Sequence, residues 1–326
     1  MAAITLLEAV RQGLWEEMER DPSVFLLGED IGVYGGAFKV TEGFLERFGA
    51  ERVIDTPISE SAIVGAACGA AMMGMRPVAE MQFIDFISCC FDMLTNYAAK
   101  SRYRQGIGIP IVVRGPSGGG VKAGPFHSQN VESFFLNTPG LKMVEPSTPY
   151  DAKGLIKAAI RDDDPVLFFE HKLLYRNPKI KQEVPTEDYI VPIGKAAIRR
   201  EGRDLSIITY GAMVYTALDA AAKLEEEGID VEVLDLRSLL PFDREAVCET
   251  VKKTSKVIIL HEATRTGGMA GELTAVINEE VFEYLDGPVT RVTAIDTPVP
   301  YAAPLEEFFL PQVDDVLKAA RTLSAY

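Results

Sequence analysis

Residues 55–86 read DTPISESAIVGAACGAAMMGMRPVAEMQFIDF, and this pattern predicts a turn, a helix and a strand in succession. Glu60 closes the turn, where the positive end of a helix dipole favours a carboxylate. The helix that follows is rich in alanine and glycine, so a neighbouring element is able to approach its backbone closely. RPVAEM then reads as a buried strand. By itself this position leaves two readings of Glu60 open, a first-turn helix acid and a functional carboxylate.

The alternation of strands and helices continues on both sides of this stretch. Thr5 and Glu8 have capping-box spacing at the start of a helix that ends near Arg20. Apolar runs at SVFLLGED, IPIVVRG, LKMVE and PVLFF predict strands, and the spacing predicts helices over 85–104, 128–137 and 147–161. The alternation breaks over 170–195, which carries three prolines and little periodicity. A second α/β series follows, so the fold class expected is α/β with two mostly parallel-sheet domains at 1–180 and 196–326, joined by a linker at 181–195.

Composition narrows the class of protein. The chain has 326 residues, 47% of them hydrophobic and 25% charged, with a formal net charge of −15. This charge argues against nucleic acid or an anionic membrane as partner and is compatible with docking onto a basic protein surface. No apolar run approaches the roughly 20 residues of a membrane span, and a cytoplasmic location is expected. The four cysteines lack CxxC spacing, which predicts buried thiols rather than bridges or zinc ligands.

Three loops of the first domain follow predicted strands, where parallel sheets collect their ligands. They are the turn at 56–60, the loop after Met81 and the glycine-rich loop RGPSGGGVKAGPFHSQ at 114–129. The last matches neither standard phosphate-binding motif, so as a phosphate cradle it is weak. His127 at its end is a candidate for proton transfer, because an imidazole titrates near working pH. His261 also follows a strand, and there a packed structural role is favoured over a second site.

No metal-binding motif occurs in the sequence. The acidic run RDDDP at 161–165 reads either as a solvated connection or as a monovalent-cation site made of helix-end carbonyls and a carboxylate.

Six ordered segments together resemble one family: GEDIG at 28–32, IDTPISES at 54–61, GMRPVAEMQF at 74–83, HSQ at 127–129, PGLKMVEPSTPYDAKGLIKAAIRDDDPV at 139–166 and HEATRTGGMAGE at 261–272. The chain looks like the beta subunit of the thiamine-diphosphate-dependent decarboxylating component of 2-oxo acid dehydrogenase complexes. The resemblance spans nearly the whole chain. It implies a thiamine-diphosphate-binding pyrimidine domain followed by a transketolase C-terminal-like domain.

The resemblance also implies roles for single residues. Glu60 matches the carboxyl that hydrogen-bonds a ring nitrogen of the cofactor's aminopyrimidine, and His127 matches the histidine that handles the 2-oxo acid and acyl transfer. The remaining pocket positions are an aliphatic contact, an amide and a stacking aromatic: Ile58, Gln82 and Phe86. A potassium site, formed mostly by carbonyls, corresponds to Ile111, Ala159, Ile160, Asp162 and Asp164. The family often has asparagine at the position of Asp164.

The family binds the cofactor's diphosphate through a magnesium ion held by a separate alpha subunit, and this chain lacks the corresponding GDG…N segment. The resemblance therefore implies an α2β2 heterotetramer that is active only with its alpha partner. A lipoyl acyltransferase component is the expected acceptor of the acyl group. HSQNVESFF, EMQFIDF and HEATRTGG favour a branched-chain 2-oxo acid as substrate, whereas pyruvate and acetoin dehydrogenase subunits are the alternatives. A non-catalytic docking scaffold is the hypothesis of a different class.

Overall fold

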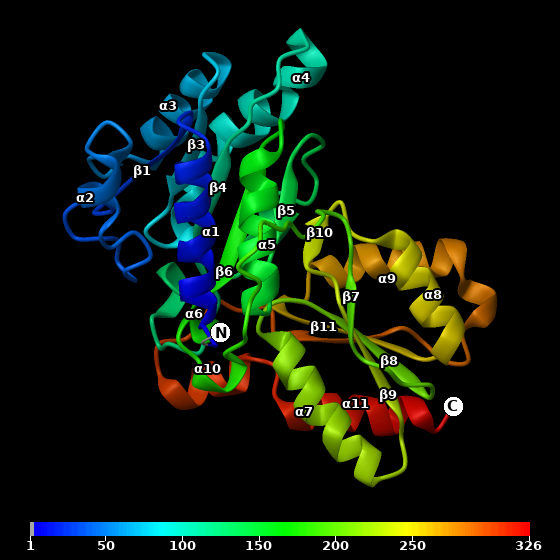
Figure 1. Ribbon diagram of the computed structural model, residues 1–326. Helices are drawn as coiled ribbons and strands as arrows, with labels where there is room; N and C mark the ends of the chain where they lie inside the picture. The colour runs from blue at the N-terminus through cyan, green and yellow to red at the C-terminus, as the bar shows by residue number, and fades with distance from the viewer. Residues whose placement is uncertain (1–2) are drawn as a thin grey trace. The chain divides into compact units, whose positions relative to one another are not determined.

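The N-terminal helix shows how local sequence sets an element. In the computed structural model, which describes residues 3–326, α1 (Leu6–Arg20) begins after Thr5, whose side chain accepts a hydrogen bond from the Glu8 N–H. The Glu8 carboxylate accepts from the Thr5 N–H at 2.7 Å, so the predicted capping box is confirmed. A Cβ at Gly13 would lie 2.4 Å from Cγ2 of Ile156 in α5 (Pro149–Arg161). Glycine there lets α1 and α5 lie side by side, as Figure 1 shows.

The described residues form two compact units. Among the described residues, the first comprises 3–117 and Phe134–Ile193, and the second comprises Gly118–Ser133 and Gly194–Tyr326. The glycine-rich segment that carries His127 therefore groups with the C-terminal part of the chain. The domain boundaries predicted at 180 and 195 stay a prediction.

A parallel sheet forms the centre of the first unit, with strand order β5-β6-β4-β3-β1-β2. Its strands are buried almost throughout, as expected for a sheet covered on both faces. They are β1 (Val24–Gly28), β2 (Val53–Asp55), β3 (Arg76–Glu80), β4 (Val112–Ser117), β5 (Lys142–Val144) and β6 (Val166–His171).

The helices of the first unit include one correction to the sequence prediction. The single helix expected over 85–104 is a 3-10 helix, a π-helix and a short α-helix in succession, a change of winding of the kind that often marks functional sites. With α1 and α5, the helical elements are α2 (Phe44–Phe48), α3 (Glu60–Met72), η1 (Ile84–Cys90), η2 (Met93–Ala98), α4 (Ala99–Gln105), α6 (Lys172–Tyr175) and η5 (Pro178–Ile180).

The prediction of a helix over 128–137 is also wrong. Only η4 (Glu132–Phe134) forms, as a 3-10 turn. The physical reason is that polar side chains of this segment bond to distant residues: Asn130 Nδ2 donates to Glu262 at 2.8 Å, and Glu132 accepts from the Tyr210 hydroxyl at 2.6 Å. These tertiary bonds override the helical spacing.

The second unit is also α/β, with sheet order β12-β11-β8-β9-β7. All its neighbouring strands are parallel except β7, which runs antiparallel to β9 at the edge. α7 packs against α11 and α8 against α9, and Figure 1 shows these pairs on opposite faces of the sheet. The strands are β7 (Ala197–Arg200), β8 (Leu205–Thr209), β9 (Val231–Asp235), β11 (Val257–Thr264) and β12 (Thr290–Ala294), with β10 (Ser238–Leu240) after β9. The helices are η3 (Gly124–Phe126), α7 (Met213–Glu226), α8 (Arg244–Thr254), α9 (Met269–Glu280), η6 (Phe282–Tyr284), α10 (Ala303–Phe309) and α11 (Val313–Ser324).

The predicted α/β class with two mostly parallel sheets is therefore confirmed. The cysteines are free thiols. Cys68, Cys90 and Cys248 are buried, as predicted, whereas Cys89 is exposed, so the prediction of a buried thiol is wrong there. Within residues 3–326, no helix combines the length and the hydropathy that crossing a bilayer requires.

A buried ion network holds the middle strands of the first sheet together. Arg114 on β4 is 1% exposed; its guanidinium bonds Glu170 on β6 at 2.5 and 2.7 Å and also bonds Glu80 on β3. The Tyr175 hydroxyl donates to Glu170 at 2.8 Å. Such charges are stable in the interior only when paired in this way. The network fixes the end of β3, two residues before Gln82.

Candidate active site

The ends of three neighbouring strands define an edge of the first sheet. Gly28 at the end of β1 is in register with Asp55 of β2 on one side and with Glu80 of β3 on the other. The loops that follow these strands carry GEDIG, the turn at 56–60 and Gln82. Parallel register therefore brings them to the carboxyl edge of the sheet, where ligands of such sheets bind.

Asp55 fixes the loop after β1. Its carboxylate accepts from the Gly32 N–H at 2.6 Å and from the Val33 N–H at 3.3 Å. A Cβ at Gly32 would lie 2.6 Å from Asp55 Oδ2, so a larger residue there would have to displace the carboxylate that bonds this loop. The loops after β1 and β2 are thereby held together.

Glu60 is the first residue of α3 and is half-buried. Glu29, which is 6% exposed, lies close enough to Glu60 for the two carboxyl groups to interact electrostatically. Burial first, and then the Glu60 carboxylate, raise the pKa of Glu29 above its usual value of 4.5, although the Ser59 N–H donates to it. Oε1 of Glu29 is a buried atom with no hydrogen-bond partner among the described residues. The sequence prediction assigned no role to Glu29; its position directly after a buried strand was the available signal.

The other predicted pocket residues lie around this edge. Gln82 is half-buried, and its Nε2 donates to Asp30 Oδ2 at 3.1 Å, which orients the amide. Phe86 is half-buried in η1, and Ile58 is 83% exposed. Ser61 Oγ donates to the Cys89 carbonyl at 2.5 Å, which ties the start of α3 to η1. The four side chains supply a carboxyl, an amide, an aromatic ring and an apolar group, which together are able to hydrogen-bond and stack on a planar polar ring.

The small-residue helix α3 has two different faces. Ile63, Val64 and Ala67 are buried, whereas Ala62, Ala66 and Gly69 are exposed. Met73, at the helix end, is 84% exposed. Exposed apolar surface of this kind commonly marks a protein contact. The predicted subunit interface on this helix stays a prediction.

His127 belongs to the second unit. It is half-buried at the end of η3, directly after the turn that begins at Gly124. Gly124 has φ +69°, and a Cβ there would lie 2.2 Å from the Tyr301 ring. Only glycine fits this position, so the backbone just before His127 has a defined path.

The glycine-rich loop is not a phosphate cradle. The N–H groups of Gly119, Gly120 and Lys122 donate to the carboxylates of Glu262 and Glu306. The donors that a phosphate would need are therefore used within the chain.

The other two histidines have structural roles. His261 is fully buried in β11, with Nδ1 3.1 Å from the Ala263 carbonyl, and desolvation lowers the pKa of its imidazole to about 4. His171 caps α6 by accepting from the Leu173 N–H at 3.3 Å.

The predicted potassium ligands lie near one end of α5, and cationic side chains already contact them. Arg76 donates to the carbonyls of Ile160 and Asp162 at 3.0 and 2.9 Å. Lys142 bonds the Asp162 carboxylate at 2.6 Å, and Arg102 bonds Asp164 at 2.6 Å.

Backbone donors engage two more of these oxygens. The Ile111 carbonyl accepts from Val166 at 3.0 Å, and the Ala159 carbonyl accepts from Asp162 at 3.3 Å. Carbonyl and carboxylate oxygens are the right donors for a hard cation, but the negative charge here is already balanced by guanidinium and ammonium groups. The arrangement does not call for an added ion, and potassium binding stays a prediction. Among residues 3–326, no cluster of His, Cys, Asp and Glu side chains has the composition of a metal site.

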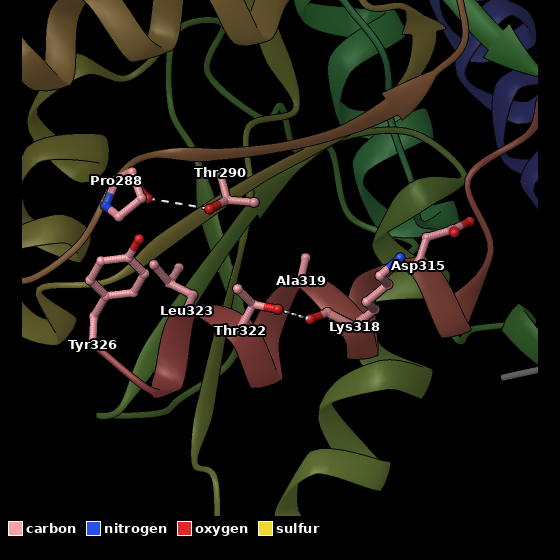
Figure 2. Close-up of a pocket in the computed structure, with 8 residues that line it drawn as sticks. All are labelled: Pro288, Thr290, Asp315, Lys318, Ala319, Thr322, Leu323 and Tyr326. Carbon is pink, nitrogen blue, oxygen red and sulfur yellow. Dashed lines mark hydrogen bonds between the residues drawn. The ribbon is translucent and has the colours of Figure 1, made fainter.

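The second unit also carries a shallow hollow of about 320 Å³. Figure 2 shows its lining, contributed by the segment around β12 and by α11, with Asp315 and Lys318 at one end and Tyr326 at the other. Most of the remaining lining is apolar, and the Thr322 hydroxyl is bonded to the Lys318 carbonyl at 2.9 Å. The hollow is therefore a mixed apolar and charged surface rather than a catalytic pocket.

Comparison with known families matches both parts of the chain. Residues 2–178 match the transketolase pyrimidine binding domain, and residues 194–316 match the transketolase C-terminal domain. The split-gene transketolase solved as an inactive beta4 tetramer is 23% identical and superposes with a TM-score of 0.80 over 99% of both chains. At this identity the structural likeness shows the fold alone.

Two relatives match over all or nearly all of their length. The 2-oxoisovalerate dehydrogenase subunit beta of Bacillus subtilis (strain 168) is 52% identical, over 100% of both chains. The pyruvate dehydrogenase E1 component subunit beta of the same organism is 46% identical, over 98% of both chains.

Proposed function

The chain belongs to the family of thiamine-diphosphate-dependent 2-oxo acid dehydrogenase beta subunits, and we propose that it acts in the oxidative decarboxylation of a branched-chain 2-oxo acid. The acyl group formed would pass to the lipoyl group of an acyltransferase component. The observation that supports a branched-chain substrate is the 52% identity, over the full length, with a subunit named for 2-oxoisovalerate. The 46% identity with a pyruvate dehydrogenase subunit supports pyruvate as the second candidate, and acetoin is the third.

Glu60 is the residue proposed to bind the cofactor's aminopyrimidine nitrogen. Thiamine diphosphate, when bound, supplies the nucleophilic carbon and the electron sink for decarboxylation. The Glu60 carboxyl is at the start of α3, at the sheet edge, and would hold a proton at the ring nitrogen. Gln82, oriented by Asp30, would bond the amino side of the ring, and Phe86 and Ile58 would contact its faces. The buried, unpartnered Oε1 of Glu29 next to Glu60 supports a polar ligand at this edge.

His127 is proposed to move a proton on the 2-oxo acid or on the lipoyl sulfur during acyl transfer. Its half-buried imidazole follows a glycine turn whose path is fixed by Tyr301. An imidazole is able both to accept and to donate a proton, which suits both steps.

An alpha subunit is required by this proposal. A partner of this kind would hold the magnesium ion and the diphosphate and complete an α2β2 tetramer. The exposed apolar face of α3 and the 83% exposed Ile58 support a contact near the cofactor edge. The purified chain alone should therefore decarboxylate no 2-oxo acid, and turnover by the isolated chain would contradict the proposal.

The acyltransferase component is proposed to dock on the second unit. Acidic side chains outnumber basic ones in residues 194–326, and the hollow at α11 offers apolar surface beside Asp315. This combination suits a small basic domain. A cytoplasmic location is also proposed and is not needed for the steps above. Potassium binding is implied by the resemblance alone, and the steps above do not depend on it.

The test is turnover by the chain reconstituted with its alpha subunit. We expect kcat/KM for 3-methyl-2-oxobutanoate to exceed that for pyruvate by about tenfold or more, because added methyl groups are worth roughly 1–3 kcal/mol in an apolar pocket. A preference for pyruvate would assign the chain to the second candidate.

Glu60→Gln separates catalysis from the docking-scaffold hypothesis. In the reconstituted complex this variant should lower decarboxylation by about 10²–10⁴-fold, the range of general acid–base contributions, while size-exclusion chromatography shows the same tetramer. Glu51→Gln, at an exposed position before β2, is the matched control. Unchanged turnover in Glu60→Gln would favour the scaffold.

A further inference from the structure

The segment Gly118–Ser133 is held by a buried carboxylate on β11. Glu262 is 4% exposed, and its Oε1 accepts from the Gly119 N–H at 2.5 Å and from Asn130 Nδ2 at 2.8 Å. Gly119 comes before His127 and Asn130 after it. One carboxylate oxygen therefore joins the two arms of the loop that carries the histidine.

A second buried carboxylate holds the tip of the same loop. Glu306 on α10 is 3% exposed and accepts from the Gly120 N–H at 3.0 Å and from the Lys122 N–H at 3.0 and 3.2 Å. Gly120 and Lys122 both have left-handed backbone, with φ +80° and +61°. For lysine this conformation is unfavourable and persists only where surrounding contacts impose it. Glu306 supplies such a contact through charge-assisted hydrogen bonds.

Further contacts leave little freedom in the arms of the loop. The Gly118 N–H donates to the Gln129 carbonyl at 3.1 Å, and Glu132, which is 1% exposed, accepts from Tyr210 at 2.6 Å. Phe126, next to His127, is 61% exposed. The loop is therefore bonded at its base and along one side, and Phe126 beside the half-buried His127 is exposed.

Burying two carboxylates is costly unless hydrogen bonds compensate their charge. Loop N–H groups provide that compensation here, so the carboxylates and the loop stabilise each other.

We propose that Glu262 and Glu306 are positioning residues for His127, because they fix the backbone of the loop that presents its imidazole. The catalytic consequence rests on the proposed function. The anchoring itself does not, and it can be measured without any substrate.

The anchoring is tested by trypsin cleavage after Lys122 in the full-length chain. The side chain of Lys122 is exposed, but its backbone is clamped, so cleavage requires the loop to open. We expect Glu306→Ala and Glu262→Ala to speed cleavage at this bond by about tenfold or more, since removing a charge-assisted bond raises the open population by that order.

Glu307→Gln and Glu272→Gln, at exposed positions of α10 and α9, are the matched controls and should cleave like the wild type. Glu306→Gln keeps the shape of the side chain, so it serves where the alanine variant fails to fold. Cleavage at the wild-type rate in folded Glu306 and Glu262 variants would overturn the proposal.

A double-mutant cycle with His127 tests the catalytic consequence in the reconstituted complex. Glu306→Gln should lower the rate of acyl transfer to the lipoyl group by about tenfold, yet by less than about twofold when His127 is already alanine, because residues that act as one unit are not additive. An equal loss in both backgrounds would show a general structural effect and contradict positioning. If the wild-type complex turns over no 2-oxo acid while cleavage after Lys122 still responds, the proposed function fails and the anchoring stands.

Discussion

The candidate edge at the ends of β1, β2 and β3 in the first unit and the His127 loop of the second unit are built in opposite ways. At the edge, each candidate side chain follows its strand within a few residues, and parallel register brings the strand ends together. The His127 loop depends on carboxylates 143 and 186 positions away in sequence, which bond Gly119 and Gly120. A site formed by strand register can be predicted from the local sequence pattern. A site held by residues distant in sequence is defined only once the chain has folded.

The largest expected effect comes from a substitution at Gly124 that distorts the His127 loop. In Gly124→Ala the new Cβ would meet the Tyr301 ring at 2.2 Å, and the residue would keep φ at +69°. We expect acyl transfer to fall by about 100-fold, comparable to a cost of roughly 1–3 kcal/mol for backbone strain. Stopped-flow acylation of a lipoyl domain by the reconstituted complex measures this.

Gly271→Ala is the control for this prediction. Gly271 lies in α9 with open space around it, so alanine should be neutral or slightly stabilising. Wild-type acylation by Gly124→Ala would show that the path of the loop is unimportant.

The second effect is an acid sensitivity of the second unit. Burial lowers the pKa of His261 from 6.5 to about 4. Between pH 4 and pH 6.5, His261 is therefore mostly protonated in the unfolded chain and mostly neutral in the folded chain. The stability that this group contributes is complete above about pH 6.5 and is lost as pH falls toward 4, at up to about 1.4 kcal/mol per pH unit.

His261→Gln should flatten this dependence even if it lowers stability at pH 7, because glutamine does not titrate. Urea unfolding of the chain from pH 4 to pH 8 measures the slope. A slope that is identical in the two proteins would exclude His261 as its source.

The third effect has the opposite sign and belongs to the candidate edge of the first unit. The raised pKa of Glu29 means that the folded chain retains a proton that the unfolded chain has lost, so this group costs stability as pH rises above about 4.5. Glu29→Gln should therefore be more stable than the wild type at pH 8, and the difference should vanish below pH 4.5.

The same denaturant titrations give the result for Glu29→Gln, with Glu51→Gln as an exposed control. A difference that grows toward acid pH would contradict the assigned cause. Together, the two titrations would separate the units by the direction of their pH dependence.

The smallest effect concerns potassium. Arg76, Arg102 and Lys142 already bond the oxygens of the predicted cation site. Replacing potassium by choline at constant ionic strength should therefore shift the melting temperature by less than about 2 °C, which corresponds to about 1 kcal/mol for a protein of this size. A larger rise that is specific to potassium would establish the ion in place of the balanced charges.

Many local features could be predicted because short-range physics decides them. The capping box of α1 is formed by Thr5 and Glu8, which are three residues apart. Buried strands such as β1 and β6 can be recognised in the sequence as apolar runs. The helix predicted from the spacing over 128–137 does not form, because Asn130 bonds to Glu262 on β11 and Glu132 bonds to Tyr210. The edge strand β7 was not predicted, since its half-exposed residues depend on pairing with β9.

By itself the sequence determined the α/β class, the alternation that yields two sheets, the family resemblance and the positions of Glu60, Gln82 and His127 after strands. These follow from apolar periodicity, caps and glycine placement, which act over a few residues. Only the tertiary structure decided that Glu29 lies beside Glu60, that Arg76 contacts the carbonyls near the end of α5, and that Glu262 and Glu306 hold the His127 loop. The physical reason is that a buried charge takes whatever partner the fold brings to it, and that partner can lie anywhere along the chain.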